Sequence, residues 1–212
     1  MQNKICSLVT GGGGFIGMHL VQQLLDQGGI VKVLEISDAV CPKEVEVIRG
    51  SVTDIDTVRY ALKGTDRLFH LAANPFLWAH DKKTFDHVNH EGTRVVLSEA
   101  KRANINKVVH TSTESILSTR PSKNQSIHSS VVPMLEDMPG PYCRSKFLAE
   151  QEAFKAAQDG LPVVIVSPTL PIGPGDRHLT PPTQMILNFL NRNTPAYLDC
   201  KLNVVDVRDV AK

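Results

Sequence analysis

The glycine-rich segment Thr10–Gly17 constrains this chain more than any other stretch. It follows the apolar residues Ile5, Leu8 and Val9, which indicate a strand, and it opens a helical pattern. Its glycines fit G-x-G-x-x-G at 12, 14 and 17 and G-x-x-G-x-x-G at 11, 14 and 17. In either spacing, the missing Cβ lets the backbone turn tightly and approach a phosphate. A glycine run alone is also typical of a flexible turn, but a strand before it and a helix after it predict a site for a dinucleotide pyrophosphate.

Apolar runs with strand character alternate with helical patterns along the rest of the chain. This alternation predicts an α/β fold of Rossmann type, a doubly wound parallel sheet with helices on both faces. The expected strands are Ile5–Val9, Ile30–Ile36, Val45–Ile48, Arg67–Leu71, Lys107–Thr111 and Pro162–Val166, and the expected helices are Phe15–Gln27, Asp54–Leu62, Lys82–Ala103 and Tyr142–Gln158.

Two segments interrupt this alternation. Arg120–Pro141 is rich in Pro, Ser, Asn and Gln, and we expect it to form a long loop beside the site. Pro168–Pro182 contains five prolines and two glycines before the helical pattern Thr183–Leu190. Proline-rich stretches are often rigid connectors, but this one leaves the carboxyl end of an expected strand, where open α/β sheets bind ligands. A rigid connector and a substrate contact both remain open.

Composition excludes several classes of partner. Lys+Arg 23 against Asp+Glu 22 gives a formal net charge of +1 without a block of like charges, so we expect no nucleic-acid partner. The four cysteines are far apart and the eight histidines form no ligand pattern, so we expect reduced thiols and no metal. No apolar run approaches the roughly 18 residues that span a bilayer, and no secretory signal begins the chain. We therefore expect a cytoplasmic protein with no membrane span.

Glu35 stands at the end of the second expected strand, eighteen residues after Gly17. This is close to the spacing at which an acid accepts hydrogen bonds from the adenosine ribose of a dinucleotide. A carboxylate would repel the 2′-phosphate of NADP, and no arginine immediately follows to bind that phosphate. The residue therefore favours NAD over NADP, although a solvated acid at a strand end is the simpler alternative.

Tyr142 and Lys146 stand four residues apart in an expected helix, so both side chains lie on one face. Lowering the pKa of a tyrosine from near 10 by about three units takes about 4 kcal/mol. An ammonium about 4 Å away supplies about 4 kcal/mol at an effective dielectric of about 20. With help from the positive charge of an oxidised nicotinamide, the pair can therefore make a base that works at neutral pH. Tyr-x-x-x-Lys is common on protein surfaces, and its position after the glycine turn and the fifth strand gives it weight.

The fifth expected strand ends in a hydroxyl-rich tip, Thr111-Ser112-Thr113-Glu114-Ser115. Hydroxyls at this edge of the sheet can hold a substrate oxygen beside Tyr142, although Ser and Thr are also common where strands turn. A serine hydrolase is the rival use of such a serine. No G-x-S-x-G elbow surrounds Ser112 or Ser115, which disfavours hydrolysis.

Five motifs together resemble the extended short-chain dehydrogenase/reductase superfamily, and within it the NAD-dependent epimerase/dehydratase family. They are Thr10-Gly-x-x-Gly-Phe-Ile-Gly17, Phe69-His-Leu-Ala-Ala73, Val88-Asn-His-Glu-Gly-Thr93, Thr111-Ser-Thr113 and Tyr142-x-x-x-Lys146. Shorter members of the superfamily need a glycine at position 15, which Phe15 excludes. The resemblance covers essentially all 212 residues. Leu77-Trp78-Ala79, Gly140–Glu150 and Ser167–Asp176 look most like hopanoid-associated sugar epimerases and dihydroflavonol-4-reductase-like enzymes.

The resemblance implies a role for each matching residue. Thr113 takes the family's Ser/Thr position beside the substrate oxygen, and Tyr142 is the acid/base. Lys146 binds the nicotinamide ribose and lowers the pKa of Tyr142, and Asn89 anchors its helix beside the nicotinamide. The implied cofactor contacts are Gly11, Gly14, Phe15, Ile16, Gly17, Glu35, Ser51, Val52, Leu71, Ala72, Ala73, Asn89, Tyr142, Lys146 and Pro168.

Two features depart from the family pattern. Gly50-Ser51-Val52 stands where the family has Gly-Asp-hydrophobic, so we expect weaker recognition of adenine, with Ser51 as the remaining hydrogen-bonding group. Family members also continue well beyond a point equivalent to Lys212. The resemblance thus implies an NAD-binding Rossmann domain over 1–168 and the start of an incomplete substrate-binding region over 169–212.

The residues and the resemblance lead to two hypotheses. The first is an NAD-dependent enzyme acting on a secondary alcohol or ketone of a sugar-like or related small molecule, with epimerase, reductase and dehydratase activities all open. The second is a truncated, non-catalytic dinucleotide-binding module. Family members often dimerise through the helices at 82–103 and 142–158, so the resemblance also implies a homodimer.

Overall fold

A six-stranded parallel sheet forms the centre of the computed structural model, which describes residues 4–37, 40–117, 133–197 and 199–212. The strands are β1 (Cys6–Thr10), β2 (Ile30–Glu35), β3 (Glu46–Arg49), β4 (Arg67–His70), β5 (Lys107–Thr111) and β6 (Val163–Val166). Their order is β3-β2-β1-β4-β5-β6, and every neighbouring pair is parallel. This is the doubly wound, Rossmann-type sheet that the sequence predicts, with its order reversing between β1 and β4.

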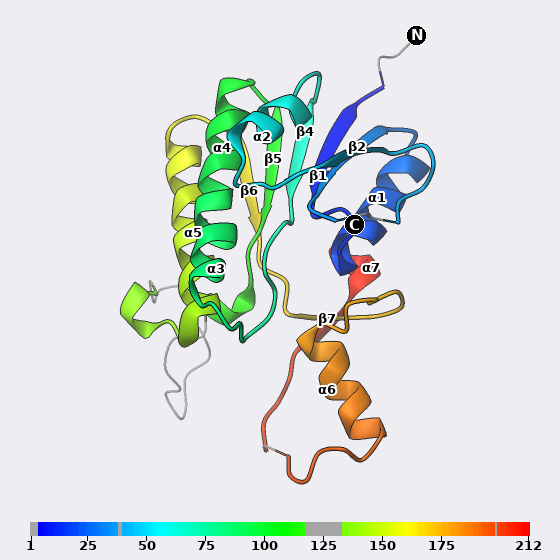
Figure 1. Ribbon diagram of the computed structural model, residues 1–212, viewed down its shortest axis with the longest axis vertical. Helices are drawn as coiled ribbons and strands as arrows, with labels where there is room; N and C mark the ends of the chain where they lie inside the picture. Colours follow the sequence, from blue (N-terminus) through cyan, green and yellow to red (C-terminus); the bar gives the residue numbers. More distant parts are fainter. Residues whose placement is uncertain (1–3, 38–39, 118–132, 198) are drawn as a thin grey trace.

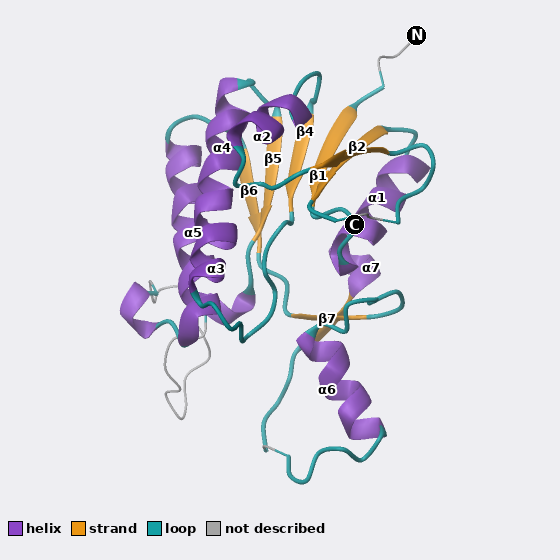
Figure 2. Cartoon of the chain, viewed as in Figure 1, coloured by secondary structure: helices purple, strands orange, loops and turns teal. Residues whose placement is uncertain are grey.

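Helices cover both faces of the sheet (Figure 1 and Figure 2). They are α2 (Ile55–Ala61), α4 (Gly92–Arg102) and α5 (Gly140–Gln158), side by side on one face, and α1 (Phe15–Asp26) on the other. Each face of the sheet has its own hydrophobic core, and neighbouring residues of β1 contribute to different cores, because side chains alternate between the two faces along a strand. Leu8 packs with residues of α2, α4 and α5, whereas Val9 packs with residues of α1.

All six predicted strands form, and each boundary lies within one residue of its prediction. In the central strand β1 all five residues are buried, and its apolar residues Leu8 and Val9 made the strand recognisable. The predicted helix over Asp54–Leu62 begins one residue later, because Asp54 caps α2 by accepting a hydrogen bond from the N–H of Asp56 at 3.0 Å.

The helix predicted over Lys82–Ala103 is interrupted. It consists of a short turn, α3 (Lys83–Phe85), a π-helical segment at Asp86–Glu91, and α4. A π-helical segment widens the helix locally but leaves the apolar periodicity nearly unchanged, so the sequence did not predict it. Such segments often occur at functional sites, and this one carries Asn89.

Most of the loop expected at Arg120–Pro141 lies outside the described residues. The described part contains a short 3-10 turn at Leu135–Asp137. The next helix, α5, begins at Gly140, two residues before its predicted start at Tyr142. Pro141 fits the first turn of that helix, because no intrahelical acceptor exists there for the N–H that proline lacks.

The segment Pro168–Pro182 is more ordered than a connector. It contains β7 (Leu170–Ile172), which pairs in parallel with β8 (Val204–Asp206) in a second, two-stranded sheet. At Gly173 the backbone has a φ of +154°, and a Cβ would lie 2.7 Å from a methyl group of Val207. Glycine therefore allows the turn after β7 to pass close to the chain that follows β8.

The chain then forms α6 (Pro181–Leu190) and, after β8, α7 (Val207–Val210). The predicted start of α6 at Thr183 is wrong by two residues, because two prolines occupy its first turn. Ala211 packs into the core beside α1. Within the described ranges, no helix is long and apolar enough to cross a membrane.

Candidate active site

The glycine-rich turn between β1 and α1 leaves no room for side chains at three positions. Gly11 has a φ of +71°, and a Cβ there would lie 2.8 Å from the Cα of Ala72. A Cβ at Gly12 would lie 2.6 Å from a methyl group of Val33. At Gly17, a Cβ would overlap the carbonyl oxygen of Gly11. Positions 11, 12 and 17 all require glycine, so the turn is compatible with both spacings read from the sequence.

The same turn directs backbone donors out of the end of α1. Gly14 caps the helix in an extended conformation, and its N–H donates to the carbonyl of Gly11 at 3.0 Å. The following amides, those of Phe15, Ile16 and Gly17, belong to the first turn of a helix, where no intrahelical acceptor exists. The turn thus offers amide donors and a positive helix end to an anion.

Glu35 ends β2 and reaches the glycine-rich turn. Its Oε2 accepts a hydrogen bond from the N–H of Gly13 at 3.2 Å, and its Oε1 accepts one from the N–H of Ile36 at 3.0 Å. The fold therefore brings together an acid and a turn that are well separated in the sequence. Its carboxylate gives this end of the site a negative charge.

Ser51 and Val52 follow β3 at the same edge of the sheet. The hydroxyl of Ser51 accepts a hydrogen bond from the N–H of Thr53 at 3.1 Å and shares another with the hydroxyl of Thr53 at 2.8 Å. Val52 is buried, and its methyl group lies 2.8 Å from where a Cβ of Gly92 would stand. The side chain of Val52 packs in the core, which leaves its backbone for any contact with a cofactor.

Leu71–Ala73, directly after β4, run along the glycine-rich turn. The N–H of Leu71 donates to the carbonyl of Thr10 at 3.1 Å, and the N–H of Ala72 donates to the hydroxyl of Thr10 at 3.3 Å. All three side chains are half-buried. The structure thus joins the predicted residues after β4 to the turn after β1.

A hydrogen-bonded chain through His70 links the end of β1 to the helix that carries Asn89. Nδ1 of His70 lies 2.7 Å from the hydroxyl of Thr10, and Nε2 lies 2.9 Å from the hydroxyl of Thr93. The Thr93 hydroxyl donates to the carbonyl of Asn89 at 2.6 Å, so it accepts from Nε2–H of His70. Burial, aided by the charge of Lys146, lowers the pKa of His70 to about 3. Sequence reasoning missed this role, because a single histidine at a strand end carries no pattern of its own.

Asn89 connects three segments from its place in the π-helical segment. Its Oδ1 accepts from the N–H of Asn74 at 2.7 Å, and its Nδ2 donates to the carbonyl of Asn74 at 3.2 Å. Nδ2 also donates to the hydroxyl of Ser145 at 3.0 Å, and that hydroxyl donates to the carbonyl of Tyr142 at 2.8 Å. Asn89 therefore fixes the loop after β4 against the first turns of α5.

Tyr142, in the first turn of α5, lies near Thr113, which follows β5. Burial raises the pKa of Tyr142 above its usual value of 10.0, and the neighbouring hydroxyl of Thr113 opposes this rise. The hydroxyl of Thr113 donates to that of Ser115 at 3.1 Å. Two predicted catalytic side chains from different elements thus lie close together.

Lys146 is buried one turn further along α5. Its Nζ donates to the carbonyl of Thr111 at 2.7 Å. Burial lowers the pKa of Lys146 to about 8, and the carboxylate of Glu150 opposes this shift. In the chain by itself desolvation dominates at Tyr142 and the ammonium is directed at a backbone carbonyl, so the pKa of Tyr142 is raised. A lower pKa of Tyr142 through Lys146 and an oxidised nicotinamide together stays a prediction.

Pro168, just beyond β6, lies against the tip of β5. Its carbonyl accepts a hydrogen bond from the N–H of Glu114 at 3.2 Å, and the carbonyl of Val166 accepts one from the N–H of Ser112 at 2.7 Å. These bonds place Pro168 next to Thr113. The predicted site residues therefore follow the carboxyl ends of the strands or lie on the helices beside them. Val52 also follows a strand, but its side chain is buried in the core.

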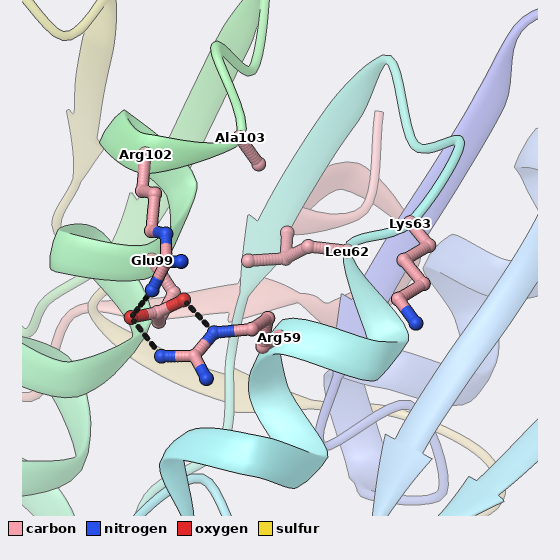
Figure 3. Close-up of a pocket in the computed structure, with 6 residues that line it drawn as sticks. All are labelled: Arg59, Leu62, Lys63, Glu99, Arg102 and Ala103. Carbon is pink, nitrogen blue, oxygen red and sulfur yellow. Dashed lines mark hydrogen bonds and ion pairs between the residues drawn. The ribbon is translucent and has the colours of Figure 1, made fainter.

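A shallow pocket between the C-terminal ends of α2 and α4 lies apart from these residues (Figure 3). Nε and Nη2 of Arg59 donate to the two carboxylate oxygens of Glu99 at 2.9 and 3.2 Å, and this bond lowers the pKa of Glu99. The pair joins the two helices. The pocket is lined by Arg59, Leu62, Lys63, Glu99, Arg102 and Ala103, none of them a predicted site residue.

Several known proteins are similar to this chain in sequence and in fold. The chain is 39% identical over 210 residues to a Synechocystis sp. protein provisionally named dihydroflavonol 4-reductase. The aligned region covers 97% of this chain and 61% of that protein. The crystal structure of gox2253 superposes with a TM-score of 0.89 at 35% identity, covering 99% of this chain and 64% of that one. The Thermus thermophilus UDP-glucose 4-epimerase in complex with NAD gives a TM-score of 0.85 at 25% identity, with 98% and 72% covered.

The chain spans less than two thirds of the length of the first two of these proteins. A family model described as the NAD dependent epimerase/dehydratase family matches residues 7–212. The match includes the glycine-rich turn, Glu35, Thr113, Tyr142 and Lys146. The chain therefore belongs to the NAD dependent epimerase/dehydratase family.

Proposed function

We propose that the protein binds NAD and acts at a secondary alcohol or ketone of a sugar-like or related small molecule, as an oxidoreductase or epimerase. The observation that carries this proposal is that the side chains of Tyr142 and Thr113 lie close together, one helical turn from the buried ammonium of Lys146. Such chemistry needs an acid/base, a second group on the substrate oxygen, and a cation beside a dinucleotide cradle.

The residues around the glycine-rich turn fit a dinucleotide. The turn at Gly11–Gly17, here called the cradle, has no room for Cβ atoms at Gly11, Gly12 and Gly17 and lies at the N-terminus of a helix. Its bare backbone and amide donors therefore suit a pyrophosphate. Glu35 would accept hydrogen bonds from ribose hydroxyls, and its charge would repel the extra phosphate of NADP. When bound, NAD supplies the nicotinamide carbon that exchanges a hydride with the substrate. The residues that would hold it are Gly11, Gly14, Phe15, Ile16, Gly17, Glu35, Ser51, the backbone of Val52, Leu71, Ala72, Ala73, Asn89, Tyr142, Lys146 and Pro168.

Tyr142 would move the proton of the reacting hydroxyl at its Oη atom, and Thr113 would hold the same substrate oxygen. Because burial raises its pKa, the phenol of Tyr142 is protonated at neutral pH. It is therefore ready to act as an acid in the direction of reduction. Acting as a base requires positive charge near the phenolate, which the ammonium of Lys146 and an oxidised nicotinamide would both supply.

Lys146 would bind the nicotinamide ribose. Its pKa of about 8 keeps the ammonium mostly charged at neutral pH, although the side chain is buried. Its present acceptor, the carbonyl of Thr111, lies at the end of β5. The lysine would thus stay anchored to the sheet while its remaining protons bind ribose hydroxyls.

We assign cofactor binding to residues 1–168 and the start of the substrate-binding region to residues 169–212. Nε2 of His19, in α1, lies 2.9 Å from the carbonyl of Pro174. Gly175 is close to Met18, whose sulfur lies 3.5 Å from the position of a Cβ there. The proline-rich segment thus passes over the first turns of α1, beside the cradle. This contact supports a substrate role for that segment over a rigid connector.

Calorimetry combined with a turnover screen tests the proposal. We expect NAD to bind more tightly than NADP, and at least one ketone or nucleotide sugar to be converted, as followed by NADH absorbance and by chromatography of epimers. NAD binding without any turnover would instead favour the non-catalytic dinucleotide-binding module. Absence of both binding and turnover would contradict the assignment altogether.

A further inference from the structure

A buried carboxylate lies on the same face of α5 as Lys146. Glu150 stands four residues after Lys146, and helical residues at this spacing are neighbours on one face. Glu150 is only 7% exposed and Lys146 only 5%. Removing a carboxylate from water is costly unless a cation or hydrogen-bond donors compensate it. Glu150 is not one of the predicted site residues, so its burial needs an explanation of its own.

Hydrogen bonding does not explain the burial of Glu150. Within the described residues, its Oε2 atom has no hydrogen-bond partner. Glu99 is 8% exposed, but both of its carboxylate oxygens accept hydrogen bonds from Arg59, at 2.9 and 3.2 Å. The carboxylate of Glu150 acts instead on Lys146, where it opposes the fall in pKa that burial causes. The two buried groups of opposite charge therefore compensate each other through space.

The other groups that meet Lys146 on α5 and at the end of β5 are uncharged. Its Nζ donates to a neutral acceptor, the carbonyl of Thr111, at 2.7 Å. Tyr142, one turn earlier on α5, is protonated at neutral pH because burial raises its pKa. Across the described ranges, the carboxylate of Glu150 is thus the one anion that acts on this ammonium.

Two histidine rings from the sheet lie within the field of the same ammonium. His70 in β4 and His110 in β5 are partners in register, and their ring centroids are 5.5 Å apart. Burial and the charge of Lys146 lower the pKa of both rings, so both are neutral at pH 7. In the part of the chain that the structure describes, neither nitrogen of His110 has a hydrogen-bond partner. A lone pair of His110 is therefore the rival to Glu150 as the group that supports the ammonium.

We propose that Glu150 is a positioning residue, whose buried carboxylate balances the ammonium of Lys146 and keeps this lysine charged in the candidate active site. The charge balance follows from the structure, whereas its use in turnover rests on the function proposed above. Without the carboxylate, a buried ammonium loses its proton more easily. Lys146 would then be neutral over part of the pH range in which Tyr142 needs a positive charge to act as a base.

An NMR titration of the chain labelled with ¹³C at the lysine Cε atoms measures the charge of Lys146 without NAD. Lys146→Met identifies the signal, because that variant lacks it. The unsubstituted chain should give a midpoint of about 8. Glu150→Gln should lower the midpoint by about one pH unit, the usual effect of losing a neighbouring opposite charge. Glu150→Asp keeps the charge and should give a midpoint closer to that of the unsubstituted chain.

Two control substitutions locate the effect. Glu152→Gln removes a carboxylate from the same helix, but Glu152 is partly exposed and lies 4.0 Å from His90. It should leave the midpoint of Lys146 unchanged. His110→Phe removes the rival lone pair and should also leave the midpoint unchanged. A lower midpoint in His110→Phe combined with an unchanged one in Glu150→Gln would assign the support to His110 and overturn the inference.

Urea unfolding gives a second readout, which also covers a Glu150→Gln chain that folds poorly. Glu150→Gln should destabilise the unsubstituted chain but stabilise the Lys146→Met chain, because there it removes a buried carboxylate that has lost its cation. A destabilisation of equal size in both backgrounds would show a merely structural glutamate and contradict the inference.

Turnover separates this inference from the proposed function. If both hold, the alkaline limb of kcat in Glu150→Gln should move to lower pH by about one unit, because Lys146 loses its proton earlier. A lower midpoint in a chain that converts no substrate would refute the proposed function but keep the role of Glu150. Turnover by the unsubstituted chain, together with an unchanged midpoint in Glu150→Gln, would refute that role and keep the function.

Discussion

Thr10 and His70 share a hydrogen bond of 2.7 Å directly beneath the glycine-rich turn. The hydroxyl of Thr10 accepts from the N–H of Ala72, so it donates its proton to Nδ1 of His70. The other ring nitrogen donates to Thr93. Both nitrogens are thus satisfied by the neutral ring. The bond joins β1 to β4, the two strands at which the sheet order reverses, and so fixes the end of β1 from which the glycine-rich turn starts.

Stability should decrease as the pH falls below 6.5. His70 has an ordinary pKa of 6.5 and a folded-state pKa of about 3, so the unfolded chain binds more protons between these values. Lowering the pH therefore favours unfolding, by about 1.4 kcal/mol per pH unit for one such group. His70→Asn should reduce this slope by about that amount, as measured by urea unfolding from about pH 7 to about pH 5.

His178→Asn is the control for that substitution, since His178 is exposed. It should leave the pH dependence of the unfolding free energy unchanged. A wild-type slope in His70→Asn would contradict the neutral assignment of the buried ring.

The sheet could be predicted because its strands are short runs rich in apolar residues, and the boundaries of β5 match to the residue. The pair β7 and β8 could not, because each has three residues and the partners Leu170 and Val204 are far apart in the sequence. Local patterns carry no information on such pairing. Pro181 and Pro182 indicate a loop when read locally, although both fit the first turn of a helix.

Some features of the candidate site could likewise be predicted from the sequence, and others could not. Helical spacing correctly places Tyr142 and Lys146 on one helix, but the direction of a pKa shift depends on burial, which spacing does not give. The bonds from Asn89 to Asn74 and Ser145 depend on three segments meeting in space. Val52 matches the family motif, yet its side chain packs in the core.

Gly17→Ala should abolish NAD binding. Its Cβ would overlap the carbonyl oxygen of Gly11, so helix and turn must separate, at a cost of about 3 kcal/mol or more of folding stability. Gly64→Ala is a useful comparison, because Gly64 has a φ of +67° but no atom within 4 Å of the added Cβ. It should cost about 1 kcal/mol and leave NAD binding intact. Equal NAD affinities in the two variants, measured by calorimetry, would argue against the cradle.

Glu35→Gln should change the choice of cofactor. Removing a negative charge about 5 Å from a 2′-phosphate relieves roughly 3 kcal/mol of repulsion at an effective dielectric of about 20. Because salt and side-chain movement reduce this figure, we expect the ratio of NAD to NADP affinity to fall by about tenfold. Glu46→Gln, on an exposed residue at the start of β3, should leave the ratio unaltered. An unaltered ratio in Glu35→Gln would remove the basis for a preference for NAD.

Tyr142→Phe tests the catalytic assignment most directly, since it removes only the hydroxyl that lies beside Thr113. Turnover of the best substrate from the screen should fall by about 100-fold or more, the usual contribution of a general acid/base. NAD affinity in calorimetry should be retained. Tyr60→Phe, at an exposed tyrosine of α2, serves as the control and should keep full activity. Wild-type turnover in Tyr142→Phe would contradict the role of this tyrosine in the reaction.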